Sequence, residues 1–478
     1  MSEIASEGLA LNPEFKGQSI TPDDPQFDTV RKVYNGAIDR RPALIVRPTG
    51  AADVMDAVNY ARVSSLPLVV RCGGHSVAGT SASEGGVLID LSSLKGVQVD
   101  PARGTAIAQG GVLWGEYDRE TQLYGRATPG GRVTTTGVGG FCLGGGYGWL
   151  SRKHGLTCDN LVGATVVTAD GGLVHATEDE HADLLWGLRG AGANFGVVTA
   201  YELRLHPLPP LLLAGLLVVP NTADAAALVR AYRDFTLTAP EEVVSAVACI
   251  LAPPAEFVPA ELVGAPVVGF VVAYVGDATE AVEALAPLRS LVTEAGGMDL
   301  VQPMPYTAFQ ALLDGFAPKG WLNYHRGMHL RDFPDEVVEP YLEVGRSIHS
   351  PMTQGIIFHH GGEVSRVPED ATASSNRSAP YMGHPIAAWS TPQETDYEMD
   401  WVARFSAAIA PATTGGTYLN FEPGTTTADL KAGFGEEKYV RLQELKSRYD
   451  PTNLFRGNHN IVPAGWSEEP REQATMPS

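Results

Sequence analysis

The stretch TPGGRVTTTGVGGFCLGGGYGWLSRKHGL, residues 128–156, decides the fold of this chain. It contains ten glycines, which cluster among large apolar side chains such as Phe141, Tyr147 and Trp149. Glycine weakens regular structure, so this density indicates backbone that passes close to a bulky ligand and turns N–H groups toward an anion such as a diphosphate. Ordinary surface loops would not concentrate large apolar residues among the glycines. We call residues 128–156 the glycine belt, and it predicts a cofactor-binding region.

A second motif, RCGGHSVAG at residues 71–79, closes an apolar strand and places His75 directly after two glycines. A serine hydrolase would need glycine two residues after its serine and a helix behind the turn. Here Ala78 stands two residues after Ser76, and the residues that follow are turn-like. The first strand is also not followed by a G-x-G-x-x-G that opens a helix, as a Rossmann NAD site requires. These patterns reject both sites and leave chemistry on the histidine.

The composition indicates a compact globular protein that acts on a small molecule. With 478 residues, 44% of them apolar and 19% charged, the chain is long enough for two domains or three. Its formal net charge of −21 repels nucleic-acid phosphates and anionic lipid, so we expect neither nucleic acid nor a membrane as a partner. The composition leaves the oligomeric state open, and a homo-oligomer is one of the outcomes.

Targeting signals and cysteine patterns favour the cytoplasm. The start, MSEIASEGLALNPEFKG, is acidic and lacks the basic and apolar parts of a signal peptide. The longest apolar run, around residues 211–219, is far too short to span a bilayer. The four cysteines stand well apart without a C-x-x-C pair, so nothing indicates a disulfide framework or a zinc site. We therefore expect a cytoplasmic protein.

The order of the elements predicts an α+β protein. Residues 42–74 are typical of a strand, a helix and a second strand, and residues 162–177 of a hairpin with its turn near Gly171. Proline density in LHPLPPLLL, residues 205–213, marks a domain boundary. The region that follows alternates strands and helices, which indicates a second α+β unit. We expect a first domain over residues 1–207, a second over 208–414, and a return to the first over 415–478.

The motifs in their order resemble a known family. RCGGHSVAG, the glycine belt, LLWGLRGAGANFGVVT and YDPTNLFRGNHNI together resemble the FAD-linked oxidases of the vanillyl-alcohol-oxidase type, and most of all their berberine-bridge-enzyme-like branch. The resemblance is dense from about residue 40 to 207 and returns from about 415 to 463. It implies an FAD-binding fold of two subdomains, with an inserted α+β substrate domain that contains an antiparallel sheet.

The resemblance implies a covalent bond between His75 and the 8α-methyl group of FAD. Many relatives carry a second link, from a cysteine in a G-x-C-P-x-V-G stretch to the flavin C6. Val133 occupies that position here, and Cys142 lies nine residues further on. We therefore expect a single covalent bond and no cysteinyl link. This departure speaks against a large carbohydrate substrate, because relatives with both links often have wide grooves for sugars.

The same resemblance implies further contacts to the cofactor. Arg71 is expected near the His75 motif, with a structural salt bridge as the alternative. Gly73 and Gly74 let the backbone pass close to the cofactor. The remaining expected contacts are Ser76, Gly79, Pro129, Gly130, Gly131, Gly137, Gly140, Gly144, Gly145, Gly148, Asn160, Val198, Asn458 and Asn460.

The implied activity is that of a flavin-dependent oxidase. Such an enzyme transfers a hydride from a small alcohol, phenol or amine to FAD, which O2 reoxidises with release of H2O2. Three alternatives stay open: a dehydrogenase that uses another acceptor, a carbohydrate oxidase, and a flavoprotein without catalytic activity.

A substrate with a hydroxyl group needs a general base. Tyr418 and Tyr381 are the candidates, although a buried tyrosine is more often an aromatic core residue. Weaker choices are Asn420, Glu363, His359 and His384. We expect no metal, because no carboxylate completes the histidine pairs at residues 325/329 and 359/360.

Overall fold

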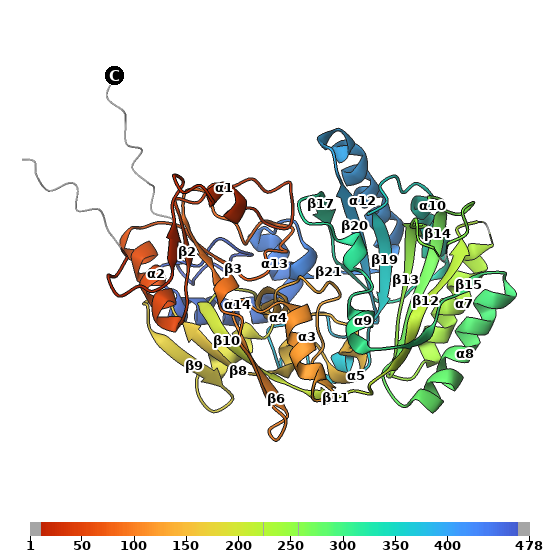
Figure 1. Ribbon diagram of the computed structural model, residues 1–478, viewed down its shortest axis with the longest axis horizontal. Coiled ribbons are helices and arrows are strands. Elements are labelled where there is room, and N and C mark those ends of the chain that lie inside the picture. The colour runs from red at the N-terminus through yellow and green to blue at the C-terminus, as the bar shows by residue number, and fades with distance from the viewer. Residues whose placement is uncertain (1–10, 223, 257, 467–478) are drawn as a thin grey trace, which may run out of the picture.

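The computed structural model describes residues 11–222, 224–256 and 258–466, and it shows two regions side by side (Figure 1). One region holds the His75 motif, the glycine belt and the last two helices, and the other is built on a large antiparallel sheet. Both regions combine helices with sheets, which confirms the expected α+β class. The acidic N-terminal stretch behind the expected localisation lies partly outside the described residues.

A four-stranded sheet carries the His75 motif at the end of β3. Its strands run in the order β1-β2-β4-β3, with β4 parallel to both neighbours. Strands such as LIVR and VLID are almost wholly apolar because parallel strands are covered on both faces. Helix α2 connects β2 to β3 and buries Val54 and Val58 against the sheet. The elements are β1 (Gln18–Ile20), α1 (Phe27–Val30), β2 (Leu44–Arg47), α2 (Ala51–Val63), β3 (Leu68–Arg71) and β4 (Val87–Asp90).

A five-stranded antiparallel sheet supports the glycine belt. Its order is β5-β6-β10-β8-β9, and the pair β8–β9 is the expected hairpin. The belt contributes Val138 and Phe141 to the core beside this sheet. The strands are β5 (Val97–Asp100), β6 (Thr105–Gln109), β8 (Leu161–Val167), β9 (Leu173–Thr177) and β10 (Val197–Arg204), and β7 (Arg126–Ala127) pairs with β11 (His206–Pro207). The helices are α3 (Trp114–Gln122), α4 (Val138–Leu143), α5 (Ser151–His154) and α6 (Ala182–Leu188).

A ten-stranded antiparallel sheet forms the second region. Its main path is β15-β12-β14-β13-β19-β20-β18-β21, with β16 on β12 and β17 on β20. The strands are β12 (Leu212–Pro220), β13 (Val243–Leu251), β14 (Pro266–Tyr274), β15 (Met298–Asp299), β16 (Gln302–Met304), β17 (Leu322–His325), β18 (Met328–Leu330), β19 (Gln354–His359), β20 (Tyr381–Trp389) and β21 (Thr413–Thr417). The helices are α7 (Ala225–Thr238), α8 (Ala278–Glu294), α9 (Tyr306–Gln310), α10 (Asp335–Arg346), α11 (Glu363–Arg366) and α12 (Thr395–Ile409).

The two faces of this large sheet have different neighbours, because successive strand residues point to opposite sides. On β20, Tyr381 and Trp389 pack into the core that α7, α8, α10 and α12 cover. Met382 packs on the other face, in a core that includes Tyr147 and Trp149 of the glycine belt. The second face therefore looks toward the region of the His75 motif.

The chain returns to the first region after β21. Helices α13 (Thr427–Phe434) and α14 (Glu436–Tyr449) add Leu430, Tyr439 and Leu442 to the core beside the five-stranded sheet. The expected boundary between residues 414 and 415 falls inside β21, and the domain division as a whole stays a prediction. Short 3-10 helices are η1 (Leu91–Ser93), η2 (Cys158–Asn160), η3 (Asp314–Phe316), η4 (Pro392–Glu394), η5 (Ala410–Ala412) and η6 (Leu419–Phe421). Within the described part of the chain, no helix combines the length and the apolar character needed to cross a membrane.

Candidate active site

A cavity of about 290 Å³ opens between the His75 motif, the glycine belt and the large sheet. Its wall comes from segments that are far apart in the sequence. Among the residues that line it are Tyr34, Cys72, Gly73, Gly74, His75, Ser76, Gly131, Arg132, Val133, Gly137, Gly140, Gly144, Tyr147, Val198, His325, Gln354, Ile356, Phe358, His384, Ile386, Asn420, Phe421, Asn458 and His459.

His75 stands in this wall with one ring nitrogen engaged. Its Nε2 lies 2.9 Å from Thr135 Oγ1, and its ring stacks on Tyr34 with 4.1 Å between the ring centroids. No described residue makes a hydrogen bond with its Nδ1. Burial, with Lys319 adding repulsion, lowers the pKa of His75 to about 4, so the imidazole is neutral at physiological pH. A neutral histidine with one free nitrogen at a cavity wall is suited to bond to a ligand.

The glycine belt leaves space in front of its backbone. Gly140 lines the cavity, and a Cβ built on it would meet no protein atom within 4 Å. Gly73 serves another purpose, because a Cβ there would collide with the backbone of Gly137. The glycines thus let two loops approach each other and leave room for a ligand.

About half of the expected cofactor contacts line the cavity. These are Gly73, Gly74, His75, Ser76, Gly131, Gly137, Gly140, Gly144, Val198 and Asn458. The expected residues outside its lining are Arg71, Gly79, Pro129, Gly130, Gly145, Gly148, Asn160 and Asn460.

Arg71 has the structural role that was the alternative. Its Nη2 donates to Asp90 Oδ2 at 2.8 Å, and Arg47 donates to the same carboxylate. Both side chains of the Arg71–Asp90 pair are buried, so the pair fixes the end of β3 to β4. Arg71 thus supports the His75 motif and does not itself line the cavity, and its contact to a cofactor stays a prediction.

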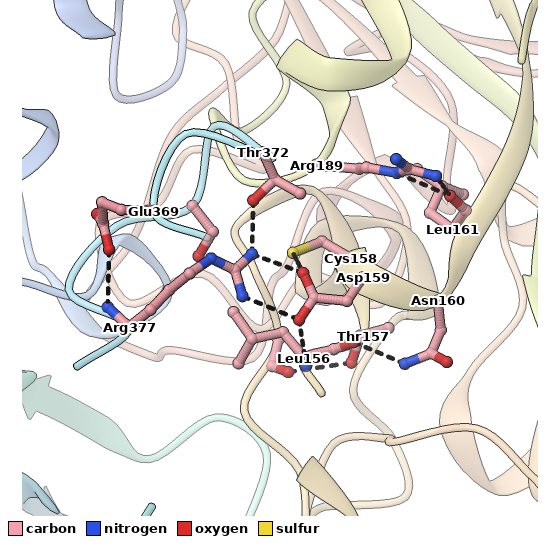
Figure 2. A network of polar contacts seen from close by, with 12 residues as sticks. Leu156, Thr157, Cys158, Asp159, Asn160, Leu161, Arg189, Glu369, Thr372 and Arg377 are labelled. Carbon is pink, nitrogen blue, oxygen red and sulfur yellow. Dashed lines mark hydrogen bonds and ion pairs between the residues drawn. The ribbon is translucent and has the colours of Figure 1, made fainter. Parts of the chain in front are cut away.

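Asn160 also supports the fold (Figure 2). Its Nδ2 donates to Leu156 O at 2.8 Å, and its Oδ1 lies 2.6 Å from His206 Nε2. The neighbouring Asp159 accepts two hydrogen bonds from Arg377, at 2.6 and 3.0 Å, as Figure 2 shows. This polar network connects the turn after the glycine belt to the segment before β20. Asn160 does not line the cavity, and its contact to the cofactor stays a prediction.

The other expected contacts outside the lining shape the backbone around the cavity. A Cβ on Gly148 would lie 2.3 Å from the carbonyl oxygen of Gly130, so these two glycines let two chain segments touch. Gly79 and Gly145 adopt positive φ angles of 71° and 103°, which favour glycine. Pro129 accepts a hydrogen bond from Thr157 through its carbonyl oxygen, and Asn460 buries its Oδ1 without a partner among the described residues.

Tyr418 does not line the main cavity, and its hydroxyl has three protein partners. The oxygen accepts hydrogen bonds from the backbone N–H groups of Gly146 and Tyr147, at 3.1 and 3.2 Å, and from Asn420 Nδ2 at 2.8 Å. Burial raises the pKa of Tyr418 to about 12. These contacts hold the glycine belt in place, and the role of Tyr418 as a general base stays a prediction.

Tyr381 packs on the face of β20 that the helices cover and does not line the cavity, so the structure gives its expected catalytic role no support. Its hydroxyl lies 2.6 Å from Thr236 Oγ1 in the core under the helices. His384 stands three residues further along the strand, so alternation brings it to the cavity face. Of the weaker choices, Asn420 and His384 line the cavity, whereas His359 contacts Arg152 and Glu363 pairs with Arg366.

Several cavity residues were not recognised as site residues from the sequence: Arg132, Tyr147, His325 and Phe358. Arg132 carried a signal, since it is a charged residue between glycine and valine in an apolar segment. Phe358 carried none, and His325 was noticed only as half of a histidine pair, because the two residues meet through the folding of separate strands. Burial lowers the pKa of His325 to about 3 and holds that of His384 well below its usual value, so both rings are neutral.

The residues present fit FAD. Both ring nitrogens of His384, the hydroxyl of Tyr147 and Asn458 Oδ1 are buried without a hydrogen-bond partner among the described residues. Buried polar atoms need partners, which the polar edges of a bound flavin and its substrate would supply. The apolar part of the wall, for example Phe358 and Ile356, suits a flat ring system. In the described part of the chain, no three His, Cys, Asp or Glu residues are placed to hold a metal ion together.

Comparisons with known proteins match the two separate parts of the sequence that form the region of the His75 motif. The family model described as FAD binding domain matches residues 42–177, and the one described as berberine and berberine like matches residues 417–462. (R)-6-hydroxynicotine oxidase of Paenarthrobacter nicotinovorans is 32% identical over 474 residues, covering 96% of this chain and 100% of that protein.

Solved structures agree with this similarity. The crystal structure of 6-hydroxy-D-nicotine oxidase from Arthrobacter nicotinovorans superposes with a TM-score of 0.84 at 29% identity, over 95% of this chain and 99% of that one. Glucooligosaccharide oxidase from Acremonium strictum, whose FAD is described as 6-S-cysteinyl and 8α-N1-histidyl, superposes with a TM-score of 0.82 at 23% identity, over 94% and 98%. The fold is thus the FAD-binding fold of the vanillyl-alcohol-oxidase type that the sequence predicted.

Proposed function

This chain belongs to the berberine-bridge-enzyme-like family of FAD-dependent oxidoreductases, and we propose that it is an oxidase of a small alcohol, phenol or amine whose FAD is bonded to His75 alone. The observation that carries the proposal is the state of His75: a neutral ring in the cavity wall, held by Tyr34 and Thr135, with Nδ1 free of hydrogen bonds to the described residues. Nδ1 is the atom that would bond to the flavin.

Val133 supports a single link. Its side chain lines the cavity at the position where relatives with two links carry a cysteine. Cys142 is fully buried in the core beside the five-stranded sheet. Cys72 does line the cavity, but its Sγ lies 3.5 Å from Val112 O, and burial raises the pKa of its thiol to about 11. A protonated thiol is a poor nucleophile, which favours the histidyl link alone.

The cavity wall supports a small, largely apolar substrate. Leu313, Phe316, Ile356, Phe358 and Ile386 surround its end at the large sheet. FAD bound in the cavity would accept a hydride from the substrate and pass two electrons to O2, giving H2O2. The chain itself holds the donor carbon in place and excludes water through this apolar wall. An oligosaccharide would need many more hydrogen-bonding side chains than these positions offer.

The test of the link is flavin fluorescence in the protein band after acid denaturation and gel electrophoresis. Wild type should fluoresce, His75→Ala should not, and the control His325→Ala, which changes another cavity histidine, should. A tryptic digest should give one flavin-carrying peptide, the one that contains His75. Fluorescence that persists in His75→Ala would overturn the histidyl link, and a folded wild type without any flavin would overturn the FAD assignment.

The test of the oxidase is the electron acceptor. The purified holoprotein is screened with small alcohols, phenols and amines, and both O2 consumption and H2O2 release are measured. One H2O2 for each substrate oxidised in air is the expected result. Turnover that requires an artificial acceptor and releases no H2O2 would identify a dehydrogenase.

A further inference from the structure

Arg132 is a half-buried cation without an anionic partner among the described residues. Its guanidinium lies 3.7 Å from the ring centroid of Phe358 and 4.8 Å from that of Trp149. Its one hydrogen bond to a described residue is long, 3.5 Å from Nη2 to Gly148 O, and its Nε is buried without a partner. No carboxylate of the described residues lies within 4.0 Å of it.

The arginines with less exposed side chains have partners. Arg377 forms a bidentate ion pair with Asp159, and Arg71 pairs with Asp90. Arg152 lacks a carboxylate but donates to backbone carbonyl oxygens, among them Val243 O at 3.0 Å. Removal of a cation from water is costly unless an anion or several hydrogen bonds replace the water. Arg132 has two aromatic faces and one long hydrogen bond to Gly148 O, so among the described residues its charge has no anionic partner.

The position of Arg132 shows where such a partner would bind. Arg132 lines the cavity, and its contact with Phe358 of β19 places the guanidinium against the large sheet. On the neighbouring strand, His384 is 5% exposed, stacks on Phe421 at 3.5 Å, and has both ring nitrogens without a partner among the described residues. The rings of Phe358 and His384 are 6.2 Å apart. A cation, a hydrogen-bonding imidazole and an aromatic face thus line the same part of the cavity.

We propose that the substrate is an aromatic or similarly flat molecule with a carboxylate, which Arg132 binds through the free edge of its guanidinium. The planar fork of N–H groups matches the two oxygens of a carboxylate, and His384 supplies a further N–H donor next to it. Burial lowers the pKa of Arg132 to about 9, which still leaves the side chain cationic at neutral pH. This inference rests on the proposed oxidase function and names the substrate class for it.

The experiment is calorimetric titration of the flavin-loaded protein with benzoate and with benzamide, its neutral counterpart of the same shape. Wild type should bind benzoate at least about tenfold more tightly, because only benzoate neutralises Arg132. Arg132→Gln should remove this preference, and Arg132→Lys should keep part of it. Arg404→Gln is the control, since Arg404 is a half-exposed residue of α12 that pairs with Asp400. Flavin content and thermal unfolding report whether each variant is folded.

Equal binding of the two probes to wild type, no measurable binding of benzoate, or an unchanged preference in Arg132→Gln would each overturn the proposal. A further outcome against it is a change of the flavin midpoint potential in Arg132→Gln without any change in the preference for benzoate, which would mean that Arg132 serves the cofactor. The calorimetric readout needs no turnover. Failure of the proposed function, seen as missing flavin or missing H2O2, is therefore distinguishable from failure of the anion site.

Discussion

Gly73 and Gly137 lie so close that a Cβ built on either glycine would come within 2.4 Å of the backbone nitrogen of the other. The His75 motif therefore rests directly on the glycine belt, with no side chain between them. This contact joins two loops that start from different sheets, and it fixes the position of His75 in the cavity wall.

Gly137→Ala should loosen this contact. Gly137 has a φ of −71°, which alanine tolerates, so the effect is steric alone. Overpacking of this kind costs about 1–3 kcal/mol of unfolding free energy, and the displaced His75 should carry less bound flavin. Chemical denaturation and flavin fluorescence in the gel measure both effects. Gly424→Ala is the matched control, because a Cβ there meets no atom within 4 Å. Wild-type values for Gly137→Ala in both measurements would contradict the contact.

Gly140→Leu should lower the flavin content without lowering the stability of the chain. No protein atom lies within 4 Å of the added Cβ, so the thermal stability of the chain without flavin should stay close to that of wild type. The leucine would instead fill space that we assign to the cofactor, and the ratio of flavin to protein in the purified sample should fall. Absorbance at the flavin and protein bands gives this ratio. Full flavin loading of the variant would show that the cofactor does not pass in front of Gly140.

Tyr418→Phe should affect stability more than chemistry. The variant leaves the N–H groups of Gly146 and Tyr147 without their acceptor, at a cost of about 1–3 kcal/mol each. Loss of a general base would instead lower kcat by about a hundredfold or more. We expect a lower unfolding midpoint and a change in kcat of less than about tenfold. A large loss of kcat at unchanged stability would restore Tyr418 as the base.

Asp118 should make stability depend on pH. It is buried between α3 and α9, where Gln310 Nε2 donates to its Oδ2 at 3.0 Å, and burial raises its pKa from 3.8 to about 7. The folded state therefore holds this proton more tightly than the unfolded state. Its contribution to stability is complete below about pH 4 and is lost as the pH rises to 7, a difference of up to about 4 kcal/mol.

The check is the unfolding free energy of wild type and Asp118→Asn from pH 4.5 to 8, a range that spans the pKa of about 7. Asparagine keeps the shape and does not titrate, so the gap between the two proteins should shift in favour of the variant as the pH rises. Parallel curves across this range would mean that Asp118 titrates close to its ordinary pKa.

The part of the site that local motifs form could be predicted from the sequence. RCGGHSVAG and the glycine belt each carry several cavity residues within one short segment. The residue types indicated a cofactor-binding region there, and the resemblance to the family singled out His75, Gly137 and Gly140, which line the cavity. The wall from β19 and β20 could not be predicted in this way. Strand alternation places Tyr381 and His384 on opposite faces of the sheet. Which of the two faces is covered by helices depends on the packing of α7, α8, α10 and α12, and the sequence of the strand does not reveal it.

Arg71 and Asn160 show a second limit of motif reading. Arg71 stands between two cavity residues in the sequence, and Asn160 lies shortly after the glycine belt, yet their partners, Asp90 and His206, lie elsewhere in the chain. A polar residue inside a motif can contact a ligand or stabilise the fold. It stabilises the fold when another part of the chain supplies a buried hydrogen-bond or ion-pair partner. Arg132 is the converse case, because no described acid reaches it.

The alternating faces of β19 and β20 separate the residues that determine substrate preference from those that determine stability, two properties that often conflict in enzymes. Gln354, Ile356, His384 and Ile386 look into the cavity, whereas Ile357 and Ala387 belong to the core under the helices. Variation at the first four positions would alter which molecules are accepted without opening that core. New substrate preferences could therefore arise in this sheet, by natural drift or in a designed library, while the scaffold keeps most of its stability.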